Sequence, residues 1–560
     1  MILEFNYLDY GIFVAYGCLI IGIGLWVSRK GKKTTEDYFL AGKSLPWWAV
    51  GASLIAANIS AEQFIGMSGS GFAIGLAIAS YEWMAALTLL IVGKYFLPVF
   101  IKQELYTIPE FVEKRYSTNL KTILAVFWIG LYVFVNLTSV LYLGATALDT
   151  ILGGGDGSIL IYCIIGLALF AAAYSLWGGL AAVAWTDVVQ VVLLIFGGLV
   201  TTFIAIKHVS PDGTILGGFS YIYEVVPHKF SMILEKGEII TPNGKDAWLD
   251  LPGLAVLLGG MWVANLYYWG FNQYIIQRTL AAKSLSEAQK GIAFAAFLKI
   301  LLPLIVVVPG IIAYVLNAGP DGVVTLETVD PSFLGDSNNI VNDNAAPWLI
   351  GNFVPPGLKG LVVAALAAAI VSSLASMLNS TATIFTMDIY QPYINKNASQ
   401  SRLVNIGRLT ATVALLIAIF LAPQLKNLGQ AFQFIQEYTG VVSPGILAVF
   451  LLGLFWKKTT NNAAIWGVVL SIPIALYFKV APNGWSDALF FMNMPFLDQM
   501  FWTLMITAAI MVLISYLENK GADHEKGIVL SRQLFATKPS FNISAFIIMV
   551  ILTFLYAMFW

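Results

Sequence analysis

One membrane-length segment, from about residue 45 to 74, is broken by polar side chains near its middle. Asn58, Ser60, Glu62 and Gln63 stand in the run, and three glycines follow within eight residues. Such backbone is stable at membrane depth only where protein buries it or where it lines a wet cavity. Broken helices of this kind hold the substrate and the coupling ion in secondary transporters. The alternative is a kinked structural helix packed through close glycine contacts.

The rest of the chain also predicts a membrane protein. Of its 560 residues 59% are hydrophobic and only 11% are charged, too few polar groups to cover a soluble protein of this size. We therefore expect an all-α polytopic fold. Apolar runs of spanning length predict about fourteen transmembrane helices, at 9–28, 45–74, 78–101, 122–150, 158–176, 180–206, 252–278, 288–316, 357–388, 406–424, 430–455, 463–479, 498–517 and 541–560.

Lysine and arginine gather in the loops that follow odd-numbered spans. Examples are the residues 29–33, Lys114 with Arg115, and Lys457 with Lys458; Arg278 falls in the same class after the seventh span. Cytoplasmic loops are enriched in these residues, so we expect these loops to be cytoplasmic and both termini to be extracytoplasmic.

Two groups of five spans predict an internal repeat. A unit with an odd number of spans inverts when it is repeated, and the first helix of each group is interrupted by polar residues, at 58–63 and at 265–273. Paired interruptions of this kind mark the binding site between inverted repeats. The predicted organisation is a single transporter domain, with an extra N-terminal helix in 1–44, the two repeats in 45–206 and 252–455, and additional C-terminal helices in 456–560.

Several ionisable side chains lie within predicted spans, where each is a functional candidate because burial in a membrane is costly. Glu82 lies in the third span, Asp187 in the sixth, Lys299 in the eighth and Glu437 in the eleventh. A buried ion pair between Glu82 and Lys299 is the structural alternative for those two residues.

The polar residues within spans are mostly neutral amides, balanced by one acid and one base. Such a set offers both hydrogen-bond donors and acceptors, which suits a neutral polyhydroxyl molecule better than an anion. Tyr268 and Trp269 supply flat apolar faces on which a sugar ring could rest. The candidate hydrogen-bonding residues are Gln63, Glu82, Asn265, Lys299 and Gln436.

A coupling ion also has candidate ligands. Ser372 and Ser373 stand in an alanine- and serine-rich run, and alkali cations prefer oxygen ligands such as hydroxyls and free carbonyls. The alternative is that these small residues simply pack helices. Two cysteines and three histidines make no metal cluster or nucleophile–histidine pair, and the net charge of −1 suggests no nucleic-acid partner. We therefore do not expect an enzyme.

Two motifs resemble the signature of the sodium/solute symporter family: the residues 174–180, YSLWGGL, and 185–190, WTDVVQ. The segments 58–71, 264–287, 364–390 and 432–458 are similar to sodium/galactose symporters of that family. The resemblance implies a LeuT-type five-plus-five inverted repeat with extra helices at both ends. It also implies sodium-driven sugar uptake across a bacterial inner membrane by alternating access, with Na⁺ as coupling ion, no other cofactor, and sugar and lipid as partners.

The resemblance assigns roles to individual residues. It implies that Gln63, Glu82, Asn265, Lys299 and Gln436 hydrogen-bond the sugar, and that Tyr268 stacks on it at the inner gate. It implies gates made by Asn58, Met67, Tyr81, Trp269 and Phe432. It implies that sodium is held by backbone oxygens of Ala56, Ile59 and Ala369 and by the hydroxyls of Ser372 and Ser373, with Asp187 on the exit route.

One position departs from the family pattern. Ala85 stands where the sodium/galactose symporter has a serine, one helical turn from Glu82. Loss of that hydroxyl removes a hydrogen bond, a change of about 0.5–1.5 kcal/mol. The expected solute is galactose or glucose. The alternatives are another neutral solute such as inositol, or a sialic acid; the sequence leaves the preferred sugar, the sodium-to-sugar ratio and the oligomeric state open.

Overall fold

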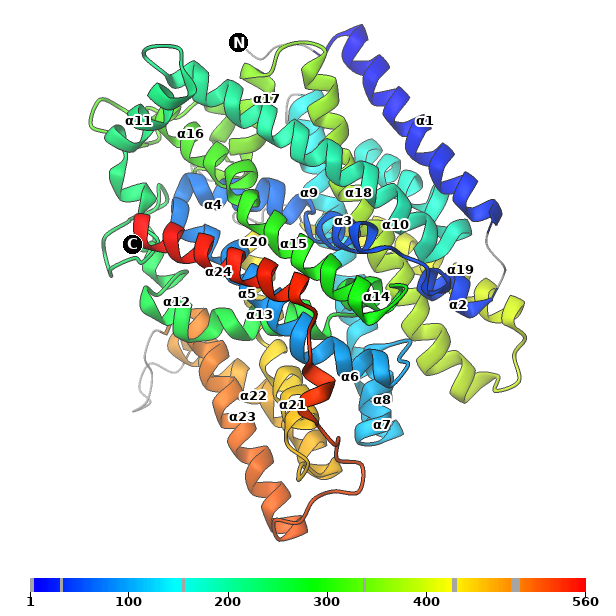
Figure 1. The fold of residues 1–560 in the computed structure, drawn as a ribbon. Helices are drawn as coiled ribbons and strands as arrows, with labels where there is room; N and C mark the ends of the chain where they lie inside the picture. The colour runs from blue at the N-terminus through cyan, green and yellow to red at the C-terminus, as the bar shows by residue number, and fades with distance from the viewer. Residues whose placement is uncertain (1–4, 31–33, 154–156, 336–338, 426–430, 485–493) are drawn as a thin grey trace.

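The computed structural model describes residues 5–30, 34–153, 157–335, 339–425, 431–484 and 494–560, and it is helical throughout (Figure 1). Within these residues three isolated β-bridges occur but no strand. The helices of the first half are α1 (Tyr7–Lys30), α2 (Thr35–Leu40), α3 (Trp47–Asn58), α4 (Ser68–Ala73), α5 (Ser80–Ile91), α6 (Leu97–Lys102), α7 (Ile108–Arg115), α8 (Thr118–Gly130), α9 (Thr138–Leu148) and α10 (Leu160–Val209).

The second half begins with the short helix α11 and ends with the long helix α24. Its helices are α11 (Ile215–Val225), α12 (Leu254–Leu258), α13 (Gly260–Phe271), α14 (Gln273–Leu280), α15 (Leu285–Val306), α16 (Val308–Asn317), α17 (Ala345–Phe353), α18 (Leu358–Ile384), α19 (Gln400–Leu421), α20 (Ala431–Gly440), α21 (Ser443–Phe455), α22 (Asn461–Gly484), α23 (Phe496–Asn519) and α24 (Pro539–Met558).

The predicted polytopic membrane fold is confirmed. Ten helices in the described part of the chain are long and apolar enough to cross a membrane, or up to eleven when one bent pair counts as a span. The other predicted spans, 45–74, 158–176, 252–278 and 430–455, form broken or shorter helices. The exact number of fourteen is therefore not confirmed.

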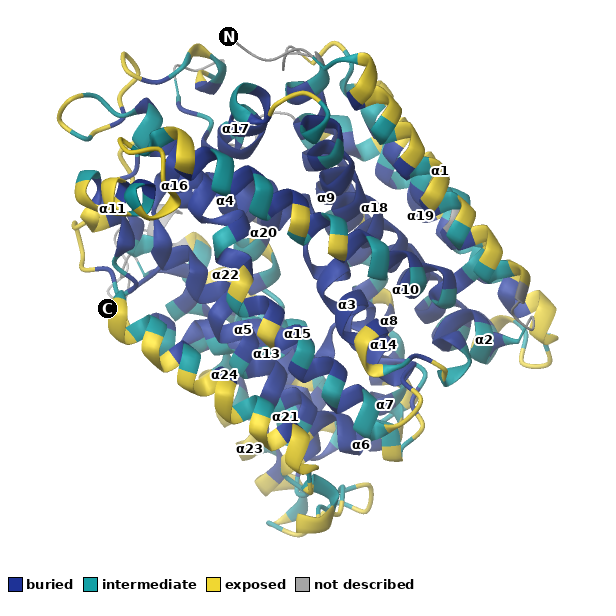
Figure 2. Ribbon diagram, turned by 45° about the horizontal axis from the view of Figure 1, so that its top comes forward, coloured by how far each residue is buried: buried dark blue, intermediate teal, exposed yellow. Residues whose placement is uncertain are grey.

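The predicted break in the second span is present. Helix α3 ends at Asn58, Ile59 has an extended backbone with ψ 97°, and the chain resumes as the π-helical segment η2 (Glu62–Met67) before α4. All residues of this stretch are buried in protein, as such backbone requires (Figure 2).

The second predicted break lies at the end of the expected 265–273 stretch. Helix α13 continues through Phe271, and the backbone turns extended at Asn272, with ψ 119°, before α14 begins. A further bend of 77° lies at Gly259 between the helical segment Ala247–Leu258 and α13. Both first helices of the two predicted repeats are thus broken.

Helix α10 contains the boundary between the fifth and sixth predicted spans. Its backbone leaves the helical region at Gly179, where φ is 58° and ψ is −154°. A Cβ atom there would lie 2.3 Å from the carbonyl oxygen of Tyr38, so the position requires glycine. The Gly-Gly pair of the sequence motif is therefore explained by a kink packed against α2.

The central helices are α3, α5, α13, α15 and α18, and α1 and α24 lie on the outside (Figure 2). Helix α18 is buried along almost its whole length, while α1 and α24 expose one side.

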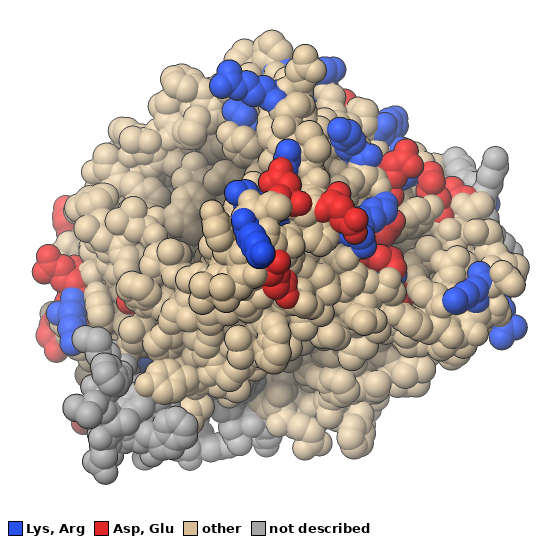
Figure 3. Space-filling view, turned by 90° about the horizontal axis from the view of Figure 1, so that it is seen from below, with Lys and Arg blue, Asp and Glu red and all other residues tan. Residues whose placement is uncertain are grey.

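Figure 3 shows charged side chains of both signs gathered in groups, separated by wide uncharged areas. Arg278, predicted in a cytoplasmic loop, is instead fully buried.

Candidate binding cavity and ion site

A narrow cavity, with about 50 Å³ of free internal volume, lies beside the break in the second span, bounded by α5, α13, α15 and the α20–α21 region. All six residues predicted to contact the sugar line it, and so do four of the five predicted gate residues. They are Gln63, Glu82, Asn265, Tyr268, Lys299 and Gln436, with Asn58, Tyr81, Trp269 and Phe432.

One wall of the cavity is built on a buried ion pair. The Lys299 ammonium donates to Oε2 of Glu82 and to Oδ1 of Asn58, and it lies 5.0 Å from the ring centroid of Trp269. The Lys299 and Glu82 side chains are 1% and 4% exposed. The buried ion pair between Glu82 and Lys299, considered above as a purely structural role, is therefore present. Both residues also line the cavity, so pairing with each other and contact with a ligand are compatible.

The Gln63 side chain is oriented by Ser60. Its Oε1 atom accepts from the backbone N–H of Ser60 at 3.1 Å and from the Ser60 hydroxyl at 2.9 Å. The side-chain NH₂ group of Gln63 is thus the end that can donate to a ligand in the cavity. The Nδ2 of Asn265 donates to the carbonyl of Met261 at 3.2 Å, which fixes that amide on the opposite wall.

A hydrogen bond joins the gate residue Asn58 to Tyr268. Nδ2 of Asn58 donates to the Tyr268 hydroxyl at 3.0 Å, and the Tyr274 hydroxyl donates to the same oxygen at 2.8 Å. The Tyr268 ring, which meets Trp269 edge to face at 5.2 Å between centroids, is thereby held in the lining of the cavity.

The opposite end of the cavity is closed by aromatic rings. Tyr81 and Phe432 meet edge to face with ring centroids 5.1 Å apart, and Gly66 is close enough to Phe432 that a Cβ would lie 2.7 Å from its Cβ. Met67 is fully buried but does not line the cavity. Its place in the outer gate is thus not supported by a direct contact with the cavity.

The predicted sodium ligands lie where the end of α3 meets α18. The Ser373 hydroxyl donates to the carbonyl of Ala57 at 3.0 Å, joining the two helices. Because the Ser60 N–H donates to Gln63, it does not close the helical hydrogen bond to the carbonyl of Ala56. Hydroxyl and carbonyl oxygens of this kind suit a hard monovalent cation.

Asp187 lies beside this region, fully buried. Its carboxylate accepts from the Ser372 hydroxyl at 2.6 Å and from the Ser53 hydroxyl at 2.5 Å, and it lies 3.4 Å from the Arg278 guanidinium. Ser372 thus connects Asp187 to the predicted ion ligands, which is consistent with a place on an ion route.

Arg278 and Ser53 are the functional candidates that the sequence did not reveal. The Arg278 Nε donates to the carbonyl of Ser53 at 3.0 Å and to its hydroxyl at 2.8 Å, and other nitrogens contact the Tyr274 carbonyl and Ser376. The available signal was Asp187, since a carboxylate at membrane depth requires a cation or donors nearby.

Ala85 lines the cavity, so the departure from the family pattern falls in the binding site itself. It lies about one helical turn after Glu82 on α5 and is 2% exposed. A hydroxyl at this position would face the same space as the Glu82–Lys299 pair.

The chain matches known proteins over most of its length. Residues 38–471 match the model of the Sodium:solute symporter family. The chain is 59% identical over 558 residues to a sodium/glucose cotransporter of Vibrio parahaemolyticus, covering 99% of this chain and 98% of that protein. It is 34% identical over 485 residues to the human sodium/myo-inositol cotransporter 2, covering 84% of this chain and 69% of that protein.

The fold is also that of a solved structure. A Na⁺-coupled sialic acid symporter in a substrate-bound outward-open state superposes with a TM-score of 0.75, covering 94% of this chain and 100% of that one. The sequence identity is 22%, so the likeness extends to the fold alone. It confirms the LeuT-type architecture expected from the sequence.

Proposed function

This chain belongs to the sodium:solute symporter family, whose activity is sodium-coupled solute symport, and we propose that the solute is a monosaccharide, galactose or glucose. The observation that carries the proposal is the convergence of six polar and aromatic side chains on one cavity beside a broken helix. The Vibrio relative named as a sodium/glucose cotransporter supports the same class of solute.

The charge of the cavity favours a neutral solute. Lys299, its cationic side chain, is paired with Glu82, so the pair adds no net charge. Recognition of a carboxylate favours arginine or an unpaired cation. Hydroxyls can instead accept from Gln63 and Asn265 and donate to Glu82, and the ring of Tyr268 offers a face for the apolar side of a sugar.

The proposed coupling mechanism depends on α3, because the end of this helix contributes to both the ion site and the solute cavity. Sodium at the carbonyls of Ala56, Ile59 and Ala369 and at Ser372 and Ser373 would draw α3 and α18 together and fix the start of the break. Asn58, the last residue of α3, would then present its amide to Tyr268 and Lys299. Downhill entry of each charge supplies about 2.3 kcal/mol per 100 mV.

We place the protein in a bacterial inner membrane with both termini outside, because lysine and arginine gather in loops after odd-numbered spans. Alternating access would then expose the cavity first past the Tyr81–Phe432 ring pair and later past Tyr268.

The test is uptake of labelled galactose or glucose into proteoliposomes, with and without an inward sodium gradient. We expect concentrative, sodium-dependent uptake that unlabelled sugars compete and proline does not. Gln63→Ala should abolish sugar binding, while Gln533→Ala, at an exposed position, should transport normally. Uptake by the Gln63→Ala protein at the normal rate would refute the site.

A second neutral solute, inositol, is favoured by one observation. Ala85 leaves the cavity one hydroxyl short of the sodium/galactose pattern, and the human relative at 34% identity is named a sodium/myo-inositol cotransporter. Unlabelled myo-inositol in the same assay distinguishes the two: competition stronger than that of galactose would assign the cyclic polyol instead.

A further inference from the structure

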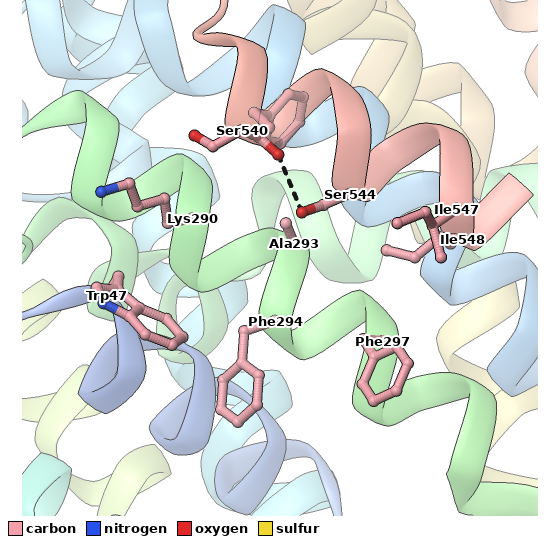
Figure 4. A pocket seen from close by; sticks show the side chains of 10 residues that line it. Trp47, Lys290, Ala293, Phe294, Phe297, Ser540, Ser544, Ile547 and Ile548 are labelled. Carbon is pink, nitrogen blue, oxygen red and sulfur yellow. Dashed lines mark hydrogen bonds between the residues drawn. The ribbon is translucent and has the colours of Figure 1, made fainter.

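A second cavity opens on the outer wall of the helix bundle, between α15, α24 and the first residue of α3 (Figure 4). It is a groove open to the surroundings, with a free volume of about 400 Å³. Both α15 and α24 belong to helices that can span a membrane. In a membrane the groove would open between two spanning helices, so a molecule of the bilayer is the expected occupant.

The lining of the groove changes character along its length. On α15 it is lined at positions spaced by three and four residues, from Lys290 through Phe294 to Phe297; on α24 it is lined from Ser540 to Ile547. Both helices run in the same sense from the predicted cytoplasmic side. Lys290 and Ser540 lie at one end, together with Trp47, and Ser544 lies beside Ala293 in the middle, while Phe297, Ile547 and Ile548 line the other end (Figure 4). This is the polarity of a lipid, with a polar head and an apolar chain.

The polar end of the groove carries one lysine, Lys290. The Lys290 side chain is 40% exposed and lies 3.4 Å from Glu287, whose other oxygen accepts from the backbone N–H of Trp47 at 2.9 Å. Glu287 is thus held in place by α3, and the ammonium keeps donors for a further partner.

We infer that the groove binds an anionic phospholipid, with the phosphate at Lys290 and one acyl chain along Phe294, Phe297 and Ile547. Basic pockets between transmembrane helices on the cytoplasmic side suit anionic head groups. An acyl chain in contact with these side chains is shielded from water as in the bilayer, so the selectivity resides in the head group. This inference depends on the membrane embedding and the proposed orientation, and not on which solute is carried.

The occupied groove would brace helices that carry the solute cavity. Its floor joins α3 and α15, since the Phe294 ring meets Trp47 at 5.6 Å between centroids. Helix α24 joins α5 through the ring pair of Trp83 and Tyr556 at 5.5 Å and the hydrogen bond from Tyr556 to Ser80 at 3.2 Å. Glu82 stands on α5 and Lys299 on α15, so the lipid would tie together both halves of the ion pair.

The test is native mass spectrometry of the full-length protein, delipidated in detergent and titrated with phosphatidylglycerol or phosphatidylcholine. We expect preferential retention of one phosphatidylglycerol. Lys290→Gln should reduce that preference about fivefold, the effect of one lysine near an anionic head group. Lys520→Gln, an exposed lysine at the end of α23, is the matched control and should leave it unchanged.

A substitution that fills the groove tests the contact with the acyl chain separately from the contact with the head group. Ser544→Phe, or Ala293→Phe should the first variant fail to fold, should abolish retention of the bound lipid. Equal retention of both lipids by the unaltered protein would overturn the assignment of an anionic head group. Unchanged retention in a folded, groove-filled variant would overturn the site, and sugar uptake by the same protein reconstituted into proteoliposomes would show independently whether the proposed transport function stands.

Discussion

Replacing Lys299 by methionine should destabilise the protein strongly, and replacing its partner as well should restore most of the stability. The Lys299→Met change leaves the buried Glu82 carboxylate and the side-chain Oδ1 atom of Asn58 without their shared donor. Breaking one side of a buried pair costs about 3–5 kcal/mol. Glu82→Leu should cost less, because Lys299 keeps Asn58 and the Trp269 ring as partners. The double variant should recover most of the loss, since an apolar replacement of a whole pair is often neutral.

The free energy of unfolding is measured by denaturant titration in micelles, and sugar binding on the same samples. The pair Lys479–Glu437, 3.1 Å apart with side chains 21% and 41% exposed, is the control: Lys479→Met should cost at most about 1 kcal/mol. If the pair also holds the sugar, the double variant regains stability but not sugar binding. Binding that returns with stability would show that the pair is structural only, and a stable Lys299→Met protein would refute the energetic argument.

Three further results are expected. Ala85→Ser should tighten galactose binding roughly two- to twelvefold, the equivalent of one hydrogen bond. The control Ala86→Ser, at a buried position outside the cavity, should leave binding unchanged, and equal effects of the two substitutions would contradict the prediction. Ser373→Ala should raise the sodium concentration for half-maximal uptake by a similar factor with unchanged protein yield, and a parallel loss of yield would favour a packing role. Burial lowers the pKa of Lys229 from 10.5 to about 7, so between these pH values the unfolded chain holds a proton that the folded chain has lost. The free energy of unfolding should therefore rise from pH 7 to 10.5. Lys229→Met should flatten this rise in thermal unfolding measurements, and an unchanged pH profile would contradict the argument.

The break at Asn58 was predictable because the polar residues are local in sequence and the bilayer allows few ways to satisfy them. The second break was harder to place. The run 265–273 mixes amides with aromatic side chains, and helix α13 continues through it because Asn265 turns its amide onto the carbonyl one turn back. The backbone yields only at Asn272, where the Tyr132 hydroxyl donates to its side chain at 2.5 Å. That partner comes from a helix 140 residues away in sequence and leaves no local signal.

The burial of Arg278 was not predictable for a similar reason. In sequence it follows an apolar run and precedes two lysines, the pattern of a cytoplasmic loop. In the structure the short helix α14 packs against α3 and α18 and brings the guanidinium to Asp187. Five of the cavity residues, by contrast, were predicted as a set, because polar groups in apolar spans are functional candidates and the family resemblance implied a shared role for Gln63, Glu82, Asn265, Lys299 and Gln436.

Asn58 explains why the ion and the solute would share one energetic link. It is the last residue of α3, so its backbone position depends on the same end of the helix that supplies the proposed carbonyl ligands. Its side chain contacts both the Tyr268 hydroxyl and the Lys299 ammonium, one on each wall of the cavity. An ion that orders the end of α3 therefore orders both walls, and a solute held by those walls resists the loss of the ion. Binding free energies coupled through one element are reciprocal, which is what a symporter requires of its two sites.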